Sequence, residues 1–139
     1  QFQAKDTLRG PFEGPALITG GLGGLGLLAA QQLVEVGATS LVLASRTGVA
    51  KSDGRLARLQ MPQTAVQIRK CDVSSARDVE AMARELREQE FTNFHTLVHA
   101  AGVLDRCALA DLTSARMDAT LGPKAHGAWH LQTLPCQQM

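Results

Sequence analysis

The stretch Thr19-Gly20-Gly21-Leu22-Gly23-Gly24-Leu25-Gly26 places five glycines within eight residues and decides how this chain folds. The short apolar run before it, residues 16–19, predicts a buried strand. After it, apolar residues recur at three- and four-residue intervals, which predicts a helix from Gly24 that Gly37 terminates. The predicted apolar stripe of this helix consists of Leu25, Leu28, Ala29, Leu33 and Val36. The glycine-rich stretch is therefore expected to be a tight turn between a strand and a helix.

The glycine spacing fits two patterns of phosphate-binding turns. Gly21, Gly23 and Gly26 satisfy G-x-G-x-x-G, while Gly20, Gly24 and Gly26 satisfy T-G-x-x-x-G-x-G after Thr19. Glycine lets the backbone approach a pyrophosphate without a Cβ between them, and the N–H groups of the following helix then face the phosphates. The context of strand, turn and helix therefore predicts a dinucleotide site. A glycine turn without a ligand is the alternative.

The rest of the chain alternates between strand and helix patterns. Further strands are predicted at residues 40–44, 66–71 and 95–100, and helices at 54–60, 75–88, 113–121 and 123–131. In the helix from Ser75, which forms a capping box with Asp78, the expected apolar stripe is Val79, Met82, Ala83 and Leu86. This order predicts an α/β fold, a Rossmann-like, doubly wound parallel sheet. Residues 1–14 resemble a leader or linker, and residues 15–139 form the nucleotide-binding part.

The composition narrows the functional classes. The 139 residues allow one domain, with 45% hydrophobic and 19% charged residues. A net charge of +1 gives no reason to expect a nucleic acid or a membrane as partner. The three cysteines, Cys71, Cys107 and Cys136, form no C-x-x-C pair, which argues against a disulfide framework or a zinc site. Without a secretory signal in the sequence, a cytoplasmic location is the expectation.

The end of the second strand discriminates between nicotinamide cofactors. Sites for NAD usually carry Asp or Glu there, for the adenosine ribose, whereas an Arg suits a 2′-phosphate. Here the strand runs into Ser45-Arg46 and has no carboxylate. The planar guanidinium of Arg46 matches a phosphate, so the sequence favours NADP(H). Arg46 as a solvated surface charge is the alternative.

Together these motifs resemble a known family. T-G-G-L-G-G-L-G at 19–26, S-R at 45–46, D-V at 72–73, H-A-A-G at 99–102 and P-K-x-x-G-A-W-x-L at 123–131 occur in this order. The chain is similar over residues 15–131 to the ketoreductase domain of modular polyketide synthases and animal-type fatty acid synthases. That family is a branch of the short-chain dehydrogenase/reductase superfamily.

The resemblance implies a set of site residues and a reaction. Thr19, Gly20, Leu22, Gly23, Gly24, Leu25 and Gly26 would form the pyrophosphate turn; Ser45 and Arg46 would meet the 2′-phosphate; Asp72 and Val73 would hold the adenine; Ala100, Ala101 and Gly102 would pass beside the ribose. Lys124 would be the catalytic lysine, which binds the nicotinamide ribose and lowers the pKa of the family's tyrosine. NADPH would then reduce the β-ketone of an acyl chain on a carrier protein, and other synthase domains would be further partners.

Two departures from the family bear on activity. In the family a serine and then a tyrosine follow the lysine, whereas this sequence contains no tyrosine and closes with Pro135-Cys136-Gln137-Gln138-Met139 where an apolar strand would be expected. We therefore expect this chain to be the cofactor-binding half of the domain, with about four of the usual seven strands. We also expect it to be inactive alone. Arg106 follows Leu104-Asp105 where the family often has a second Asp, so the alcohol configuration is not inferred. An inactive nucleotide-binding or structural fragment and a free-standing reductase of small molecules are the alternatives.

Four other side chains have simpler interpretations. His126 and His130 lie four residues apart, a spacing that suits a metal, but no third ligand is apparent and they are expected to be ordinary helix-face histidines. His99 is expected to be a structural histidine at the end of its strand. Trp129 is expected to pack in the core or against another domain.

Overall fold

The computed structural model describes residues 14–49, 54, 56–59, 64–89, 91 and 94–134. Apart from Gly14, the predicted leader at 1–14 lies outside the described residues, and so does the closing segment 135–139. The expected short helix at 54–60 corresponds to a 3-10 turn, η1, at Leu56–Leu59. None of the helices in the described part of the chain combines the length and the hydropathy that a membrane span requires.

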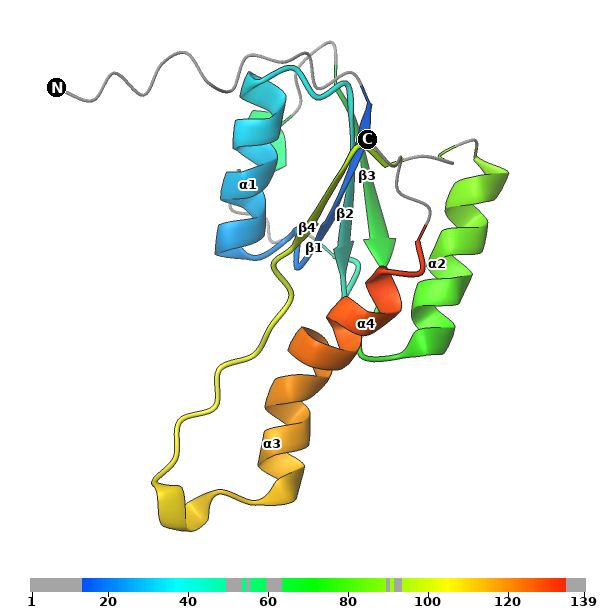
Figure 1. Ribbon diagram of the computed structural model, residues 1–139. Helices are drawn as coiled ribbons and strands as arrows, with labels where there is room; N and C mark the ends of the chain where they lie inside the picture. The colour runs from blue at the N-terminus through cyan, green and yellow to red at the C-terminus, as the bar shows by residue number, and fades with distance from the viewer. Residues whose placement is uncertain are drawn as a thin grey trace, which may run out of the picture.

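The described strands form one parallel sheet of four strands (Figure 1). These are β1 (Pro15–Thr19), β2 (Ser40–Ser45), β3 (Ala65–Lys70) and β4 (Thr96–His99), in the order β3-β2-β1-β4. Thr19, the last residue of β1, is in register with Ala44 and with His99. The carboxyl ends of the strands therefore meet at one edge, where α/β sheets bind their ligands.

Helices cover both faces of this sheet. Figure 1 shows α1 (Gly24–Glu35) on one side and α2 (Ala76–Glu88) on the other. Successive side chains of a strand point to opposite faces, so Ile18 packs in the cluster with α1 and Leu17 in the cluster with α2. Because both faces are covered, the central strands have uninterrupted apolar runs, at residues 16–18 in β1 and 41–44 in β2. The predicted doubly wound α/β fold is confirmed.

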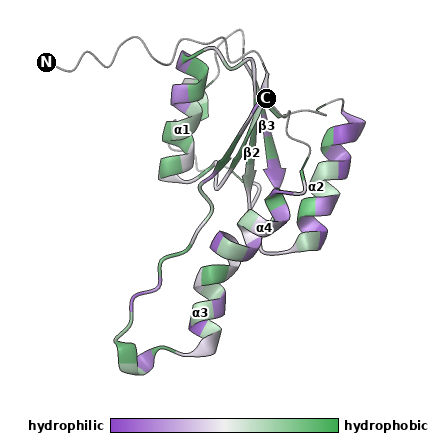
Figure 2. Ribbon diagram, viewed as in Figure 1, coloured by the Kyte–Doolittle hydropathy of each residue, from purple (hydrophilic) through white to green (hydrophobic). Residues whose placement is uncertain are grey.

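The predicted apolar stripe of the first helix is confirmed at Leu33 but wrong at Leu25 and Leu28. Leu25 and Leu28 are 72% and 60% exposed. The buried residues of α1 are Gly26, Leu27, Ala30 and Leu33. Gly26 lies so close to the Gly20 carbonyl that a Cβ would collide with it, which turns this side of the helix towards the sheet. The stripe predicted for α2, in contrast, is confirmed (Figure 2).

The two helices predicted near the end of the chain form one helical run. It consists of α3 (Ser114–Leu121), a π-helical turn η3 (Gly122–His126) and α4 (Gly127–Leu131). Figure 1 shows α3 extending away from the sheet and α4 close to it. Before α3, the chain passes through a short 3-10 turn, η2 (Leu109–Asp111).

Of the two placements expected for Trp129, packing in the core is wrong, since this side chain is 69% exposed. Packing against another domain stays a prediction. Gly127 and Leu131 are the buried residues of α4. Because they are one helical turn apart on the same side, Trp129 midway between them points the opposite way. Leu131, which is 2% exposed, takes the core position in the cluster with α2.

Candidate functional site

A cleft of about 370 Å³ lies at the carboxyl ends of the strands, a size within the range of small-molecule sites. It is lined by Gly20, Leu22, Gly23, Ser45, Arg46, Thr47, Val49, Cys71, Asp72, Val73, Ala100, Ala101, Gly102, Val103 and Pro123. Ten of these residues are among those that the sequence singled out. The cleft thus gathers residues from the ends of all four strands, although more than 80 positions separate Gly20 from Gly102 in the chain.

Five of the predicted site residues do not line the cleft. Thr19 is fully buried, with its Oγ1 2.6 Å from His99 Nδ1, and Gly26 lies beneath the turn. Gly24 and Leu25 begin α1 beside the lining residue Gly23. Lys124 follows the lining residue Pro123, and its Cε lies 3.4 Å from the point where a Cβ on Gly102 would stand. Lys124 is therefore at the rim of the cleft, next to the end of β4.

The glycine turn is held by backbone hydrogen bonds to its neighbours. The Gly21 N–H donates to the Ala44 carbonyl at 3.1 Å, and the Gly23 N–H donates to the Gly20 carbonyl at 2.9 Å. Gly20 has a φ of +66°, and a Cβ there would lie 2.5 Å from the Ala100 carbonyl oxygen. Only glycine fits this position, because the left-handed backbone and the close approach of the segment after β4 both exclude a side chain.

The turn leads into the amino terminus of α1 with its N–H groups available. Leu27 is the first residue whose N–H donates within the helix, to the Gly23 carbonyl at 2.9 Å. The three preceding N–H groups have no acceptor four residues back, and the N-cap residue Gly23 has no side chain to cap them. Gly23 itself lines the cleft. A 12-residue helix therefore presents its partial positive charge at the cleft, which favours an anionic group.

Two polar features flank this turn at the ends of β2 and β3. After β2, the Ser45 Oγ accepts the Gly48 N–H at 3.0 Å and bends the chain, with Arg46 exposed at the cleft. After β3, the Asp72 Oδ1 accepts the Ser74 N–H at 3.0 Å. Among the described lining residues, Asp72 carries the only carboxylate, so the β2 side of the cleft offers a cation without a competing acid.

The Asp72 backbone is also fixed from α2. Its N–H donates to Asp78 Oδ2 at 3.2 Å. Asp78 in turn forms the expected capping box with Ser75: its N–H donates to Ser75 Oγ at 3.2 Å, and its Oδ1 accepts the Ser75 hydroxyl at 3.0 Å. The capping box therefore helps to orient the lining residue Asp72.

His99 has the internal contact expected of a structural histidine, but only one ring nitrogen is satisfied. Its Nδ1 pairs with Thr19, while its buried Nε2 has no partner among the described residues. Within the same part of the chain, no three His, Cys, Asp or Glu side chains converge as a metal site would require. The ring of His130 instead contacts a backbone carbonyl, that of Val73.

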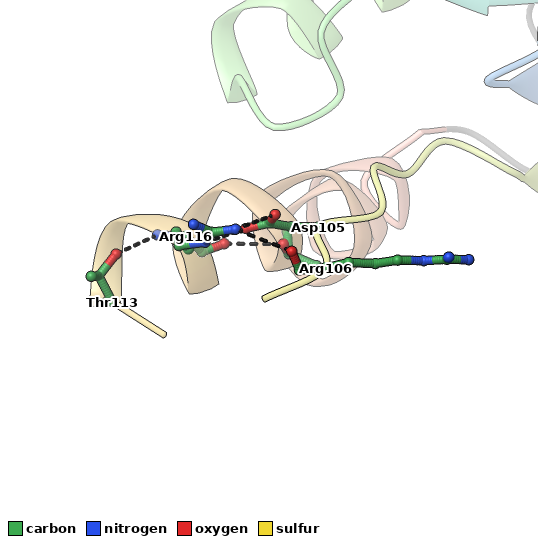
Figure 3. A network of polar contacts seen from close by, with 5 residues as sticks. Asp105, Arg106, Thr113 and Arg116 are labelled. Carbon is green, nitrogen blue, oxygen red and sulfur yellow. Dashed lines mark hydrogen bonds and ion pairs between the residues drawn. The ribbon is translucent and has the colours of Figure 1, made fainter. Parts of the chain in front are cut away.

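The segment after β4 is tied to α3 by an ion pair (Figure 3). The guanidinium of Arg116 donates to both carboxylate oxygens of Asp105, each at 2.7 Å, and to the Arg106 carbonyl at 3.4 Å. Asp105 raises the pKa of Arg116 further, by hydrogen bonding and by its charge. The Thr113 Oγ1 accepts the Arg116 N–H and caps α3. The Arg106 side chain points away from this network in Figure 3.

Sequence reasoning missed five lining residues: Thr47, Val49, Cys71, Val103 and Pro123. Each lies within three positions of a predicted site residue in the sequence. Their inclusion depends on the path of the loops after the strands, which residue patterns do not give. The surroundings of Cys71 are those of an inert thiol. Burial raises its pKa from 9.0 to about 12, and the charges of Asp78 and Asp72 add to the shift.

We expect Cys71 to resist alkylation at pH 8, because it is 2% exposed and almost entirely protonated, while the exposed Cys107 reacts readily. Peptide mapping after iodoacetamide treatment would measure both thiols separately. Since the raised pKa belongs to the folded state, the stability from protonated Cys71 is present below pH 9 and lost as the pH rises towards 12. Equal labelling of Cys71 and Cys107 in the folded protein would contradict this description.

Comparison with known proteins gives a consistent result. The family model described as KR domain matches residues 14–138. The chain is 35% identical over 124 residues to the chalcone synthase cfoA of Aspergillus candidus, covering 87% of this chain and 4% of that protein. The A-type ketoreductases from a modular polyketide synthase superpose with a TM-score of 0.76 at 37% identity, covering 89% of this chain and 26% of theirs. A ketoreductase domain from the bacillaene assembly line gives a TM-score of 0.83 at 30% identity, covering 94% of this chain and 33% of its own.

The lengths differ greatly in these comparisons. The chain spans 4% to 8% of the length of the curated relatives that it matches and roughly a quarter to a third of the ketoreductase structures named above. The similarity thus concerns one part of much larger proteins, and that part contains the whole cleft.

Proposed function

Because the chain belongs to the KR domain family, whose members here include domains of polyketide synthases, we propose that it is the cofactor-binding part of an NADPH-dependent ketoreductase. The substrate of such a domain is the β-keto group of an acyl chain attached to a carrier protein. The observation that supports the proposal is the cleft itself. It combines a glycine turn at a helix amino terminus, an arginine after β2 and a carboxylate after β3 on one edge of the sheet.

The residues of the cleft fit NADPH by their chemistry. A Cβ on Gly23 would meet only the Gly20 carbonyl, at 3.1 Å, so the outer side of the turn is open to a pyrophosphate. The N–H groups at the start of α1 would bind its oxygens. Arg46 would pair with the 2′-phosphate, and Asp72 would accept a hydrogen bond from the adenine amino group. Val73 would pack against the adenine ring.

The same arrangement gives Lys124 its role. NADPH, when bound, supplies the hydride. Lys124 at the rim beside Gly102 would bind the nicotinamide ribose and stabilise negative charge that develops on the substrate oxygen. The sequence has no tyrosine, so none of its residues matches the proton donor that the family resemblance implies. The residues in hand would therefore supply cofactor binding and the lysine, but not protonation.

A chimera tests this proposal directly. Residues 14–134 would replace the equivalent segment of the A-type ketoreductase to which the chain is 37% identical. We expect the chimera to consume NADPH with an acetoacetyl thioester of N-acetylcysteamine, and the 139-residue chain to bind NADPH weakly and not to consume it. Lys124→Ala in the chimera should lower kcat by at least about 100-fold, as for the loss of a group that stabilises the charge of the transition state. The conservative Lys124→Arg would show whether charge alone suffices.

The alternative function, nucleotide binding without reduction, makes a different prediction for the same chimera. A folded chimera that binds NADPH but does not reduce the thioester would support this alternative. A folded chimera that does not bind NADPH would contradict both functions.

A further inference from the structure

The helical run that carries Lys124 rests on the turn after β3 through two glycines. A Cβ on Gly127 would lie 2.9 Å from Val73 Cγ2, and one on Gly122 would lie 3.3 Å from Ser74 Oγ. These two glycines lie at either end of the π-helical turn that contains Lys124. The backbone of the run therefore approaches the Val73-Ser74 segment on both sides of the lysine, closer than side chains would permit.

A hydrogen bond from His130 completes this contact. Its Nδ1 lies 2.9 Å from the Val73 carbonyl oxygen. A carbonyl oxygen only accepts, so the proton of this bond is on Nδ1 and the imidazole is held in that form. Val73 is 3% exposed and lines the cleft next to Asp72, whereas His130 itself does not line it. The hydrogen bond thus joins α4 to the cleft-lining residue Val73, while His130 itself stays outside the cleft lining.

We propose that His130 is a positioning residue that fixes the Asp72-Val73 side of the cleft relative to Lys124. The inference rests on the proposed function, in which Asp72 and Val73 hold the adenine and Lys124 holds the nicotinamide ribose. These contacts involve opposite ends of one extended ligand, so their spacing must be set before binding. The turn after β3 and the run at 122–131 are more than 45 positions apart in the chain, and His130 joins them by a directional bond.

Three variants separate the hydrogen bond from the shape of the ring. His130→Phe keeps a planar ring but removes the donor, His130→Asn restores a donor, and His126→Phe is the matched control at an exposed histidine of the same run. We expect His130→Phe to weaken NADPH binding about five- to tenfold, the usual effect of one hydrogen bond. His130→Asn should recover most of this loss, and His126→Phe should bind like the unmodified chain. Unchanged NADPH affinity in His130→Phe overturns the proposal.

A second measurement needs no cofactor, so failure of the positioning role can be distinguished from failure of the proposed function. In ¹⁵N spectra of the side chains, His130 should carry its proton on Nδ1. In His130→Phe, the amide resonances of both Asp72 and Lys124 should shift, while His126→Phe leaves Asp72 unmoved. A proton on Nε2 of His130, or an unshifted Lys124, contradicts the positioning role. Failure of the unmodified chain to bind NADPH, with these spectra as expected, would count against the proposed function alone.

Discussion

Replacing Gly20 by alanine is expected to lower the free energy of unfolding by about 2–5 kcal/mol. Gly20 has a φ of +66°, and a left-handed backbone costs an L-residue about 1–2 kcal/mol. In addition, the new Cβ would lie 2.5 Å from the Ala100 carbonyl oxygen, which belongs to the backbone and cannot turn aside. Urea denaturation, followed by circular dichroism, would measure the loss.

Gly37→Ala is the matched control for this prediction. Gly37 also has a positive φ, +103°, but a Cβ there would meet nothing within 4 Å. Its replacement should therefore show only the conformational cost, about 1–2 kcal/mol. The difference between the two variants measures the contact of the turn with the segment after β4. Equal losses in both would show that this contact does not constrain the turn.

Gly23→Ala separates ligand binding from stability at the same turn. Gly23 has an extended backbone, with φ of −83°. A Cβ added there would meet only the Gly20 carbonyl oxygen, at 3.1 Å. We therefore expect a smaller loss of the free energy of unfolding than in Gly20→Ala. NADPH affinity should nevertheless fall, because the added methyl group occupies the side of the turn that is open to the cleft.

Arg46→Ala is expected to reduce the affinity for NADPH by about 10–100-fold, the range for a lost hydrogen bond to a charged group. The affinity for NADH should stay the same, because NADH lacks the 2′-phosphate. Arg46 lies after β2 in the cleft lining, where Asp72 is the only carboxylate among the described lining residues. Calorimetric titration of each variant with both nucleotides would measure the change in preference.

Arg106→Ala is the control for charge. It removes the same single positive charge from an exposed position on the segment tied to α3. NADPH affinity should be unaffected in Arg106→Ala, apart from a small long-range electrostatic effect that added salt screens. If Arg106→Ala and Arg46→Ala weakened NADPH binding equally, the net charge of the protein would explain the effect, rather than a specific contact with the 2′-phosphate. A parallel loss of NADH affinity in Arg46→Ala would also contradict the assignment.

The sequence was sufficient to predict a parallel sheet with both faces covered by helices. Glycines at 20 and 26 allow the turn after β1 to pass close to its neighbours, and apolar runs without alternation indicate strands covered on both faces. The helix start at Ser75 could also be predicted, because the capping box is a local interaction. These features depend on residues near one another in the chain, so their patterns carry the information.

Features that depend on tertiary contacts could not be predicted. In α1, leucines occur at 25, 27 and 28, so periodicity alone fits two faces, and the packing of Gly26 beneath the turn decides between them. Trp129 is apolar but lies opposite Leu131, which takes the core position. The bond from His130 to the Val73 carbonyl joins segments distant in the chain, and no residue pattern indicates it.

The central claim, that the cleft at the carboxyl ends of the strands binds NADPH, is tested most directly by an NMR titration. This method detects even weak binding and assigns it to residues. With NADPH, we predict shifts of the amide resonances of the glycine turn, Arg46, Asp72 and Gly102, at lower concentrations than with NADH. Absence of these shifts at millimolar NADPH, or shifts confined to residues away from the cleft, would contradict the account.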